Sequence, residues 1–254
     1  MPSIQISATV ITLNEERNIA RCIDALKKIA DEIVVLDSGS TDGTQRICEE
    51  KGVTFHTRPF DDYAAQKNQA ADLATHDFIL SVDADEAPSD LLRASIFAAK
   101  ANPTADVYSM DRLTSYCGHW VKHCGWYPDT KIRLYDRRKA QWTGKRIHEK
   151  VTPETGARLA RLEGDLLHYS FYTIDQHMAT VNRFSTLKAE LLHEKGRGAP
   201  FLKMILSAPV KFLKIFVFKA GFLDGSAGFH IAVNSAHGDY LKYAKLRELR
   251  KAKR

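Results

Sequence analysis

Two aspartates separated by a single residue, Asp83 and Asp85, follow an apolar run in the sequence FILSVDADE. The composition of FILSV is typical of a buried strand, so Asp83 is expected at the strand end and Asp85 in the loop after it. No lysine or arginine is adjacent in the sequence. The two carboxylates therefore repel each other unless a hard cation, Mg²⁺ or Mn²⁺, joins them to a phosphate. The competing interpretation is a solvated turn whose acids cap a helix.

Polar clusters also follow two earlier strand-like runs. TLNEE at 12–16 comes after ISATVIT, and DSGSTDGT at 37–44 comes after EIVVLD. Neither has the GxGxxG of a dinucleotide site or the GK[ST] of a phosphate-cradling loop, which argues against hydride transfer and ordinary nucleotide hydrolysis. Asp37, at its strand end, can accept a hydrogen bond from a nucleobase imide, and Asn14 or Glu16 can meet the same ligand. The alternative is a glycine-rich turn that caps a helix.

The elements that must position these clusters alternate between strands and helices. Strands are predicted at 6–12, 32–37, 53–57 and 77–83. Helices are predicted at about 19–29, 41–51 and 63–74, and Pro88 is expected to open the next one. This βαβ alternation predicts a mostly parallel sheet flanked by helices, in which ligands bind at the carboxyl ends of the strands. Beyond about residue 105 the alternation fails, although KIRLY is strand-like and a helix is expected from Ile174 to a stop at Gly196.

Composition and charge separate the body of the chain from its C-terminal part. The 254 residues are 44% hydrophobic and 27% charged, enough for one sizeable core. Residues 201–254 hold eleven basic and three acidic side chains, a net charge of +8, whereas the whole chain has +6. Such a confined basic region predicts an anionic membrane surface as partner and argues against nucleic acid. Four scattered cysteines and the absence of a signal-like start predict a cytoplasmic protein.

The segment 201–223, FLKMILSAPVKFLKIFVFKAGFL, is long and apolar but carries four lysines and Pro209. A spanning helix would bear those charges at a cost of several kcal/mol, so the segment is expected to lie on a membrane. Pro209 is expected to divide it into two short helices. The alternative is that its phenylalanines pack on the protein core.

The motifs VITLNEERNI, IVVLDSGSTDGT, AAQKNQAA and ILSVDADE, in this order and spacing, resemble the family 2 nucleotide-sugar glycosyltransferases with the GT-A fold. GWYPDTKIRLYDR, RIHEKV and LDGSAGFHIAVNSAHGDYLKY resemble a subgroup that adds sugars, often glucose, to the lipopolysaccharide inner core. The resemblance implies a GT-A domain over 1–200, with a nucleotide-sugar half at about 1–104, an acceptor half at about 105–200, and a helical basic extension at 201–254.

The resemblance also implies roles for particular residues. Asp83 and Asp85 match the family's metal-binding Asp-x-Asp, and His168 is a candidate third ligand. The residues implied in binding the nucleotide sugar, with the last two near the diphosphate, are Thr12, Asn14, Glu16, Asp37, Asp42, Arg58 and Lys67. The implied reaction is an inverting displacement at the anomeric carbon, in which a carboxylate deprotonates the acceptor hydroxyl.

Two carboxylates in the acceptor half are candidates for that base. Glu149 is the first choice and Asp129 the second, because each lies among aromatic and cationic residues. The alternative for either is an ordinary ion pair with Arg133, Arg137 or Arg146.

We therefore expect a peripheral enzyme at the inner face of the cytoplasmic membrane that moves a sugar, with UDP-glucose as the first candidate donor, onto a lipid-linked saccharide. A polyprenyl-phosphate sugar transferase is the second hypothesis, although its C-terminal spanning helices have no convincing counterpart in the sequence. A non-catalytic nucleotide-sugar-binding membrane adaptor is the third, and retention of both Asp83 and Asp85 argues against it.

Overall fold

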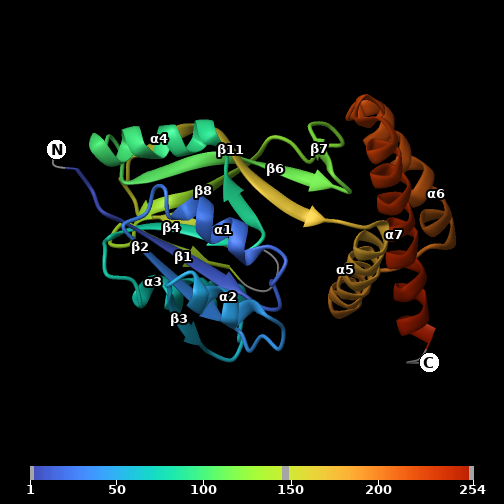
Figure 1. The fold of residues 1–254 in the computed structure, drawn as a ribbon. Helices are drawn as coiled ribbons and strands as arrows, with labels where there is room; N and C mark the ends of the chain where they lie inside the picture. The colour runs from blue at the N-terminus through green and yellow to red at the C-terminus, as the bar shows by residue number, and fades with distance from the viewer. Residues whose placement is uncertain (1–2, 145–148, 252–254) are drawn as a thin grey trace. The chain divides into compact units, whose positions relative to one another are not determined.

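A computed structural model describes residues 3–144 and 149–251, and its fold is drawn in Figure 1. Its main sheet has nine strands, eight of them in the order β3-β2-β1-β4-β8-β6-β11-β5, and β7 pairs with β6. Strands β9 (Ala140–Thr143) and β10 (Lys150–Pro153) form a separate two-stranded sheet.

The first half of the main sheet is parallel, as the sequence predicts. Its strands are β1 (Ile6–Thr12), β2 (Glu32–Asp37), β3 (Thr54–Thr57) and β4 (Phe78–Asp83), and the helices between them are α1 (Ile19–Leu26), α2 (Thr44–Glu50) and α3 (Tyr63–Asp72). Thr12 pairs with Asp37, and Ile11 pairs with Asp83. The carboxyl ends of β2, β1 and β4 therefore lie side by side. Strands β2 and β3 lie on one side of β1 and β4 lies on the other, so the order of strands along the sheet reverses at β1.

Alternate residues of these buried strands face two different hydrophobic clusters. Ile33 and Val35 of β2 join the cluster that contains apolar side chains of α1, α2 and α4 (Asp90–Ala101). Val34 faces the cluster that contains Ala64 and Ala71 of α3, together with residues of β9 and β10. Helices thus cover both faces of the parallel half, which explains why its strands are nearly continuous in apolar residues.

The second half of the main sheet is antiparallel where its pairings are defined. Strands β5 (Glu86–Pro88), β6 (Val107–Tyr116), β7 (His119–Val121), β8 (Asp129–Asp136) and β11 (Leu159–Phe171) build it. β8 pairs antiparallel with β4 and β6, and β11 pairs antiparallel with β5. The α/β class is confirmed, but the sheet is mixed rather than mostly parallel, because β8 runs antiparallel to both of its neighbours and β11 runs antiparallel to β5.

The expected helix start at Pro88 is wrong. Pro88 is the last residue of β5, and α4 begins after Ser89, whose hydroxyl accepts a hydrogen bond from Leu92 N at 3.2 Å. A serine with a side-chain oxygen free to cap the helix satisfies an otherwise unpaired N–H group, which proline does not do.

Gly164 allows β11 to pass close to the start of α4. Its φ is +90°, and a Cβ there would overlap the backbone nitrogen of Leu92 and lie 2.9 Å from the carbonyl carbon of Leu91. We expect Gly164→Ala to lower the free energy of unfolding by about 3 kcal/mol, from backbone strain and overlap together. Gly156, with φ +88° and open space around its Cβ position, is the matched control, and Gly156→Ala should cost only about 1 kcal/mol. If urea unfolding shows the same loss of stability for both variants, the close approach of β11 to the start of α4 would be contradicted.

The remaining chain is helical. It comprises α5 (Ile174–Glu194), α6 (Phe201–Leu213), a π-helical turn η1 (Lys214–Phe218), a 3₁₀ turn η2 (Gly221–Asp224) and α7 (Gly225–Lys251). Thr173 and Gln176 form a capping box at the start of α5, and Gly196 follows its end with φ +64°, as predicted. Within the described residues, no helix combines the length and apolar character needed to cross a membrane.

Pro209 does not divide the segment 201–223 as expected. It lies inside α6, and the helix changes character only at Lys214. Proline removes one backbone hydrogen bond but leaves the flanking turns able to form, so the helix continues through it.

The apolar side chains of this segment divide into two groups. Ile215 is buried, and Phe212 and Phe216 pack beside Phe229 of α7 with ring centroids 5.9 and 5.8 Å away. The exposed group is Phe201, Leu202, Ile205, Leu206, Val210, Leu213, Val217, Phe218, Phe222 and Leu223. The alternative expectation, that phenylalanines of this segment pack on the protein core, is therefore confirmed for Phe212 and Phe216. The exposed group does not pack in this way.

By internal packing the chain forms two compact units. Unit 1 comprises residues 1–112 and 129–169, and unit 2 comprises residues 113–128 and 170–254. The boundaries fall within β6, at the start of β8 and within β11. The division at residue 200 expected from composition, charge and resemblance remains a prediction about function.

Candidate active site

The loops that follow β1 and β2 are joined by hydrogen bonds. Asn14, with φ +55°, donates its N–H to Ser40 Oγ at 2.8 Å, and its Oδ1 accepts from Thr41 N at 2.8 Å. Glu16 Oε2 accepts from Gly43 N at 2.9 Å. Side chains predicted to meet one ligand therefore do come together, and they also hold the two loops in one conformation.

Asp37 and Asp42 stabilise the second of these loops from within. The buried carboxylate of Asp37 accepts hydrogen bonds from Gly39 N at 2.8 Å and Ser40 N at 2.7 Å. Asp42 accepts from Thr44 N at 3.0 Å and Thr44 Oγ1 at 2.6 Å. Burial alone would raise the pKa of Asp42, but the hydrogen bonds from Thr44 and from the backbone N–H of Glu16 together outweigh it and leave the pKa below its ordinary value. Both carboxylates thus accept hydrogen bonds from residues that follow them closely in the chain.

Arg58 and Thr12 lie at the same edge of the sheet. Arg58 donates its backbone N–H to Asp37 O at 2.9 Å, and its Nη1 lies 3.4 Å from Ala65 O. Thr12 is buried opposite Asp37, and its hydroxyl has no hydrogen-bond partner among the residues that the structure describes. The roles predicted for these residues toward a nucleotide sugar remain predictions.

Asp83 is neutralised by two cations that its sequence neighbours do not reveal. Lys67 Nζ of α3 lies 2.7 Å from Asp83 Oδ1, and Arg133 Nη2 of β8 lies 3.0 Å from Asp83 Oδ2. Burial would raise the pKa of Asp83, but the charges of Lys67 and Arg133 outweigh it and hold the pKa well below its ordinary value. No Lys or Arg is adjacent to Asp83 in the sequence, and its two cations come instead from α3 and β8, far along the chain.

Glu86 extends this charge cluster inside the protein. It is 1% exposed, its Oε1 lies 2.8 Å from Arg133 Nη2, and its Oε2 accepts from Asp83 N at 3.0 Å. Arg112 Nη1 approaches the same Oε1 at 3.3 Å. Sequence reasoning missed Glu86 and Arg112 and named Arg133 only as a possible ion-pair partner. The signal in the sequence was the third carboxylate of DADE. This residue, Glu86, is buried because β5 begins directly after the turn.

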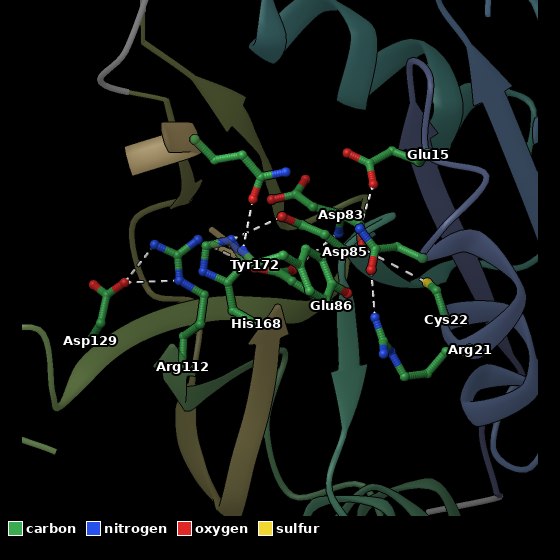
Figure 2. Close-up of polar contacts among 12 residues, drawn as sticks. Glu15, Arg21, Cys22, Asp83, Asp85, Glu86, Arg112, Asp129, His168 and Tyr172 are labelled. Carbon is green, nitrogen blue, oxygen red and sulfur yellow. Dashed lines mark hydrogen bonds and ion pairs between the residues drawn. The ribbon is translucent and has the colours of Figure 1, made fainter. Parts of the chain in front are cut away.

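Asp85 and His168 are brought together by the pairing of β5 with β11. His168 pairs with Glu86 in register, and His168 Nε2 lies 3.1 Å from Asp85 Oδ2 (Figure 2). Burial lowers the pKa of His168, but the hydrogen bond and charge of Asp85 outweigh it and leave the pKa raised. Burial and the nearby charge of Asp85 together raise the pKa of Glu15, although its hydrogen bond with Asn18 lowers it. Negative charge thus accumulates where the sequence predicted a cation.

Asp85 and His168 are two of the three predicted metal ligands. Their contact at 3.1 Å is a hydrogen bond, and it places two side chains of metal-ligating types side by side. A carboxylate oxygen and a neutral imidazole suit Mn²⁺, and the carboxylate suits Mg²⁺. Among the described residues no group of three His, Cys, Asp or Glu side chains is arranged to hold a metal. Asp83 faces Lys67 and Arg133 instead, so the structure brings two of the three predicted ligands together.

The two candidate bases have different surroundings. Asp129 lies 2.7 Å from Arg112 Nη2 and 2.9 Å from Lys131 Nζ, and these cations outweigh burial and lower its pKa. Glu149 is half-buried, and its Oε2 has no hydrogen-bond partner in the described part of the chain. The ion-pair alternative therefore describes Asp129, whose described partners are Arg112 and Lys131 rather than Arg133 or Arg137. Arg146, the other arginine considered, lies outside the described residues.

These features define an α/β protein of the GT-A type, with polar loops from three parallel strands gathered at one edge. Residues 7–160 match the family Glycosyl transferase family 2. The chain belongs to this family, as its motifs predicted.

Two curated relatives cover nearly the whole chain. The lipopolysaccharide core biosynthesis glycosyltransferase LpsC of Rhizobium meliloti (strain 1021) is 31% identical over 258 residues, 97% of this chain and 93% of LpsC. An uncharacterized glycosyltransferase of Rickettsia felis (strain ATCC VR-1525 / URRWXCal2) is 32% identical over 254 residues, 96% of this chain and 90% of the relative. The similarity thus includes the helical C-terminal part as well as the sheet.

Among solved structures, glucosyl-3-phosphoglycerate synthase of Mycobacterium tuberculosis is a weaker match. Its complex with Mn²⁺, uridine diphosphate and glucosyl-3-phosphoglycerate aligns with a TM-score of 0.47 and 17% identity, over 77% of this chain and 81% of that chain.

Proposed function

We propose that this glycosyltransferase moves a sugar, glucose from UDP-glucose in the first instance, onto a lipid-linked saccharide such as the lipopolysaccharide inner core. The similarity to LpsC over almost the full length of both chains supports the acceptor class. The donor class is supported by the hydrogen-bonded loops after β1 and β2, which carry carboxylates at the point where the strand order reverses, between β1 and β4.

The observation that carries the proposal is the contact of Asp85 with His168 beside the cluster of Asp83, Lys67 and Arg133. Asp85 and His168 would hold Mg²⁺ or Mn²⁺, and the bound ion supplies positive charge that stabilises a departing diphosphate. Lys67 is 3% exposed and lies 4.2 Å from the centre of the Trp142 ring, which restricts its position. Lys67 and Arg133 fix Asp83 in turn, so the site is held by buried charges before any ligand binds.

In the proposed reaction the acceptor hydroxyl oxygen forms a bond to the anomeric carbon, and the bond from that carbon to the diphosphate breaks. The diphosphate leaves with its electron pair as UDP, and the hydroxyl proton passes to a carboxylate. Glu149 is the proposed proton acceptor, because its Oε2 is not engaged by another described residue. Attack from the side opposite the leaving group inverts the anomeric configuration.

We also propose that the enzyme works at the inner face of the cytoplasmic membrane. The exposed apolar group of 201–223 and the net charge of +8 in 201–254 support contact with an anionic bilayer. Part of the terminal charge has another task. Lys245 Nζ donates to Asn182 O at 2.9 Å and Ser185 Oγ at 2.8 Å, and Arg247 Nη1 donates to Ala199 O at 3.0 Å. Those side chains join α7 to the rest of unit 2.

A ligand-dependent thermal shift tests the donor class. With Mn²⁺, UDP-glucose at about 100 times its dissociation constant should add about 2.7 kcal/mol of stability. UDP-galactose and UDP-N-acetylglucosamine, assayed in parallel, identify the sugar, and GDP-glucose is the control for the base. Stabilisation by GDP-glucose but by no UDP-sugar would overturn the donor assignment, and stabilisation without transfer to lipopolysaccharide core acceptors would overturn the acceptor assignment.

A further inference from the structure

Unit 2 contains a groove between α6 and α7 that the proposed reaction does not use. Its volume is about 590 Å³, within the range of small-molecule sites. α6 and α7 pack against each other in this unit and lie side by side in Figure 1. The lining is partly apolar and partly basic, and its residues are Pro200, Leu202, Lys203, Leu206, Ser207, Val210, Lys211, Lys214, Asp239 and Tyr243.

The apolar side chains of the groove form a continuous stripe along α6. Leu202, Leu206 and Val210 are separated by four residues each, so they lie on one face of the helix. Their exposed fractions are 66%, 48% and 62%. An exposed stripe of this kind beside a hollow is typical of a surface that binds an apolar ligand.

Lysines flank this stripe without acidic partners. Lys203, Lys211 and Lys214 have no carboxylate within ion-pair distance among the described residues. The acidic lining residue, Asp239, lies 2.8 Å from Lys242 Nζ and is therefore already paired. The groove thus combines an unpaired positive charge with a hydrocarbon surface.

The lysines also affect one another. Burial lowers the pKa of Lys211, the nearby charges of Lys188, Lys214 and Lys242 lower it further, and Asp239 partly opposes them. A bound anion would relieve this repulsion. A purely apolar occupant would bury the same lysines without compensation and is disfavoured.

We propose that this groove binds one anionic phospholipid of the bilayer, with the headgroup among the unpaired lysines that flank the groove and an acyl chain along Leu202, Leu206 and Val210. The inference deepens the proposed membrane contact: it replaces a general electrostatic attraction by a site for an individual lipid molecule.

The experiment uses the full-length protein and two probes. Dihexanoyl-phosphatidylglycerol, kept monomeric below its micelle concentration, reports occupancy of the groove, and dihexanoyl-phosphatidylcholine is the control for headgroup charge. Sedimentation with phosphatidylglycerol vesicles reports association with a bilayer. Transfer to a short soluble acceptor is measured for every variant, so failure of the groove and failure of the transferase are separate results.

Replacing Lys203, Lys211 and Lys214 together by glutamine should weaken binding of the short phosphatidylglycerol about 100-fold, from about fivefold for each lysine. The matched control replaces Lys28, Lys139 and Lys195, all exposed and outside the groove, with the same change of net charge. That control should bind the short lipid as the unsubstituted protein does. Equal losses of lipid binding in the two triple variants would mean that binding depends on net charge alone, and would overturn the site.

Filling the groove separates insertion of a chain from surface hydrophobicity. Leu206→Trp adds apolar surface but occupies the hollow, so we expect weaker binding of the short phosphatidylglycerol. Stronger binding of the short phosphatidylglycerol by this variant would overturn the proposal. For the unsubstituted protein, equal binding of the short phosphatidylcholine would overturn it, and so would tighter binding of a phosphorylated glycolipid acceptor than of phosphatidylglycerol. A dimer that forms without lipid and that Leu206→Trp abolishes would show that a second copy of the chain occupies the groove instead. If the protein associates with vesicles but does not bind the short phosphatidylglycerol, the proposed membrane contact stands and the proposed lipid site in the groove is wrong.

Discussion

Replacing Asp85 with alanine is expected to reduce sugar transfer by about 10³-fold or more, because charge stabilisation by a metal is worth several kcal/mol in a transition state. Asp85 is partly exposed in a turn, and its described side-chain contact is the one with His168. The variant should therefore unfold at nearly the temperature of the unsubstituted protein. Initial rates at saturating Mn²⁺, together with Mn²⁺ binding by calorimetry, measure the effect.

Asp24→Ala is the matched control for this variant. Asp24 is an exposed carboxylate of α1 that lies 2.7 Å from Lys51 Nζ, so its loss removes a surface ion pair and little else. Its activity should be unchanged. His168→Gln should weaken Mn²⁺ binding as well, because it removes the second atom of the pair. Full activity of the unsubstituted protein in EDTA, or of Asp85→Ala, would rule out the metal-dependent mechanism.

Replacing Glu149 with glutamine should lower kcat by about 10²-fold or more and leave donor binding unchanged, as expected for removal of a general base. Glutamine has nearly the same size and keeps an acceptor oxygen, so packing around this half-buried side chain should survive. Single-turnover rates and the dissociation constant of the UDP-sugar separate chemistry from binding.

Asp129→Asn is the discriminating comparison. The cations Arg112 and Lys131 lower the pKa of Asp129, and a carboxylate of lowered pKa is a weaker base. We expect a smaller loss of kcat than for Glu149→Gln. If Asp129→Asn gives the larger loss with donor binding preserved, the base is Asp129.

Local sequence was sufficient for the parallel half of the sheet. The limits predicted for β1 and β2, residues 6–12 and 32–37, are those of the structure. Both runs are apolar, β-branched and bounded by polar turns, so strand formation and burial on two faces favour the same limits. The position of Asp83 at the end of β4, and the resemblance to family 2 glycosyltransferases, followed from the same local patterns.

Prediction was weaker where burial depends on a partner far along the chain. β5 has three residues and the described β11 pairing brings His168 beside Asp85 from 83 positions away. Pro88 shows the same limit: its type suits a helix start, but pairing with Leu166 places it in a strand. At Pro209 the residue type suggests a helix break, but α6 continues through it. The helix packs on α7 and tolerates one lost hydrogen bond.

The family, the strands that end at the site and the acidic residues placed there could all be predicted from the sequence, because periodicity and turn residues act over a few positions. Which charges meet depends on contacts between distant parts of the chain. Lys67, Asp83 and Arg133 belong to α3, β4 and β8, and their ion pairs form because β4 pairs with β8 and α3 packs on the sheet. Electrostatic interactions depend on distance in space and on burial, and neither can be read from spacing along the chain.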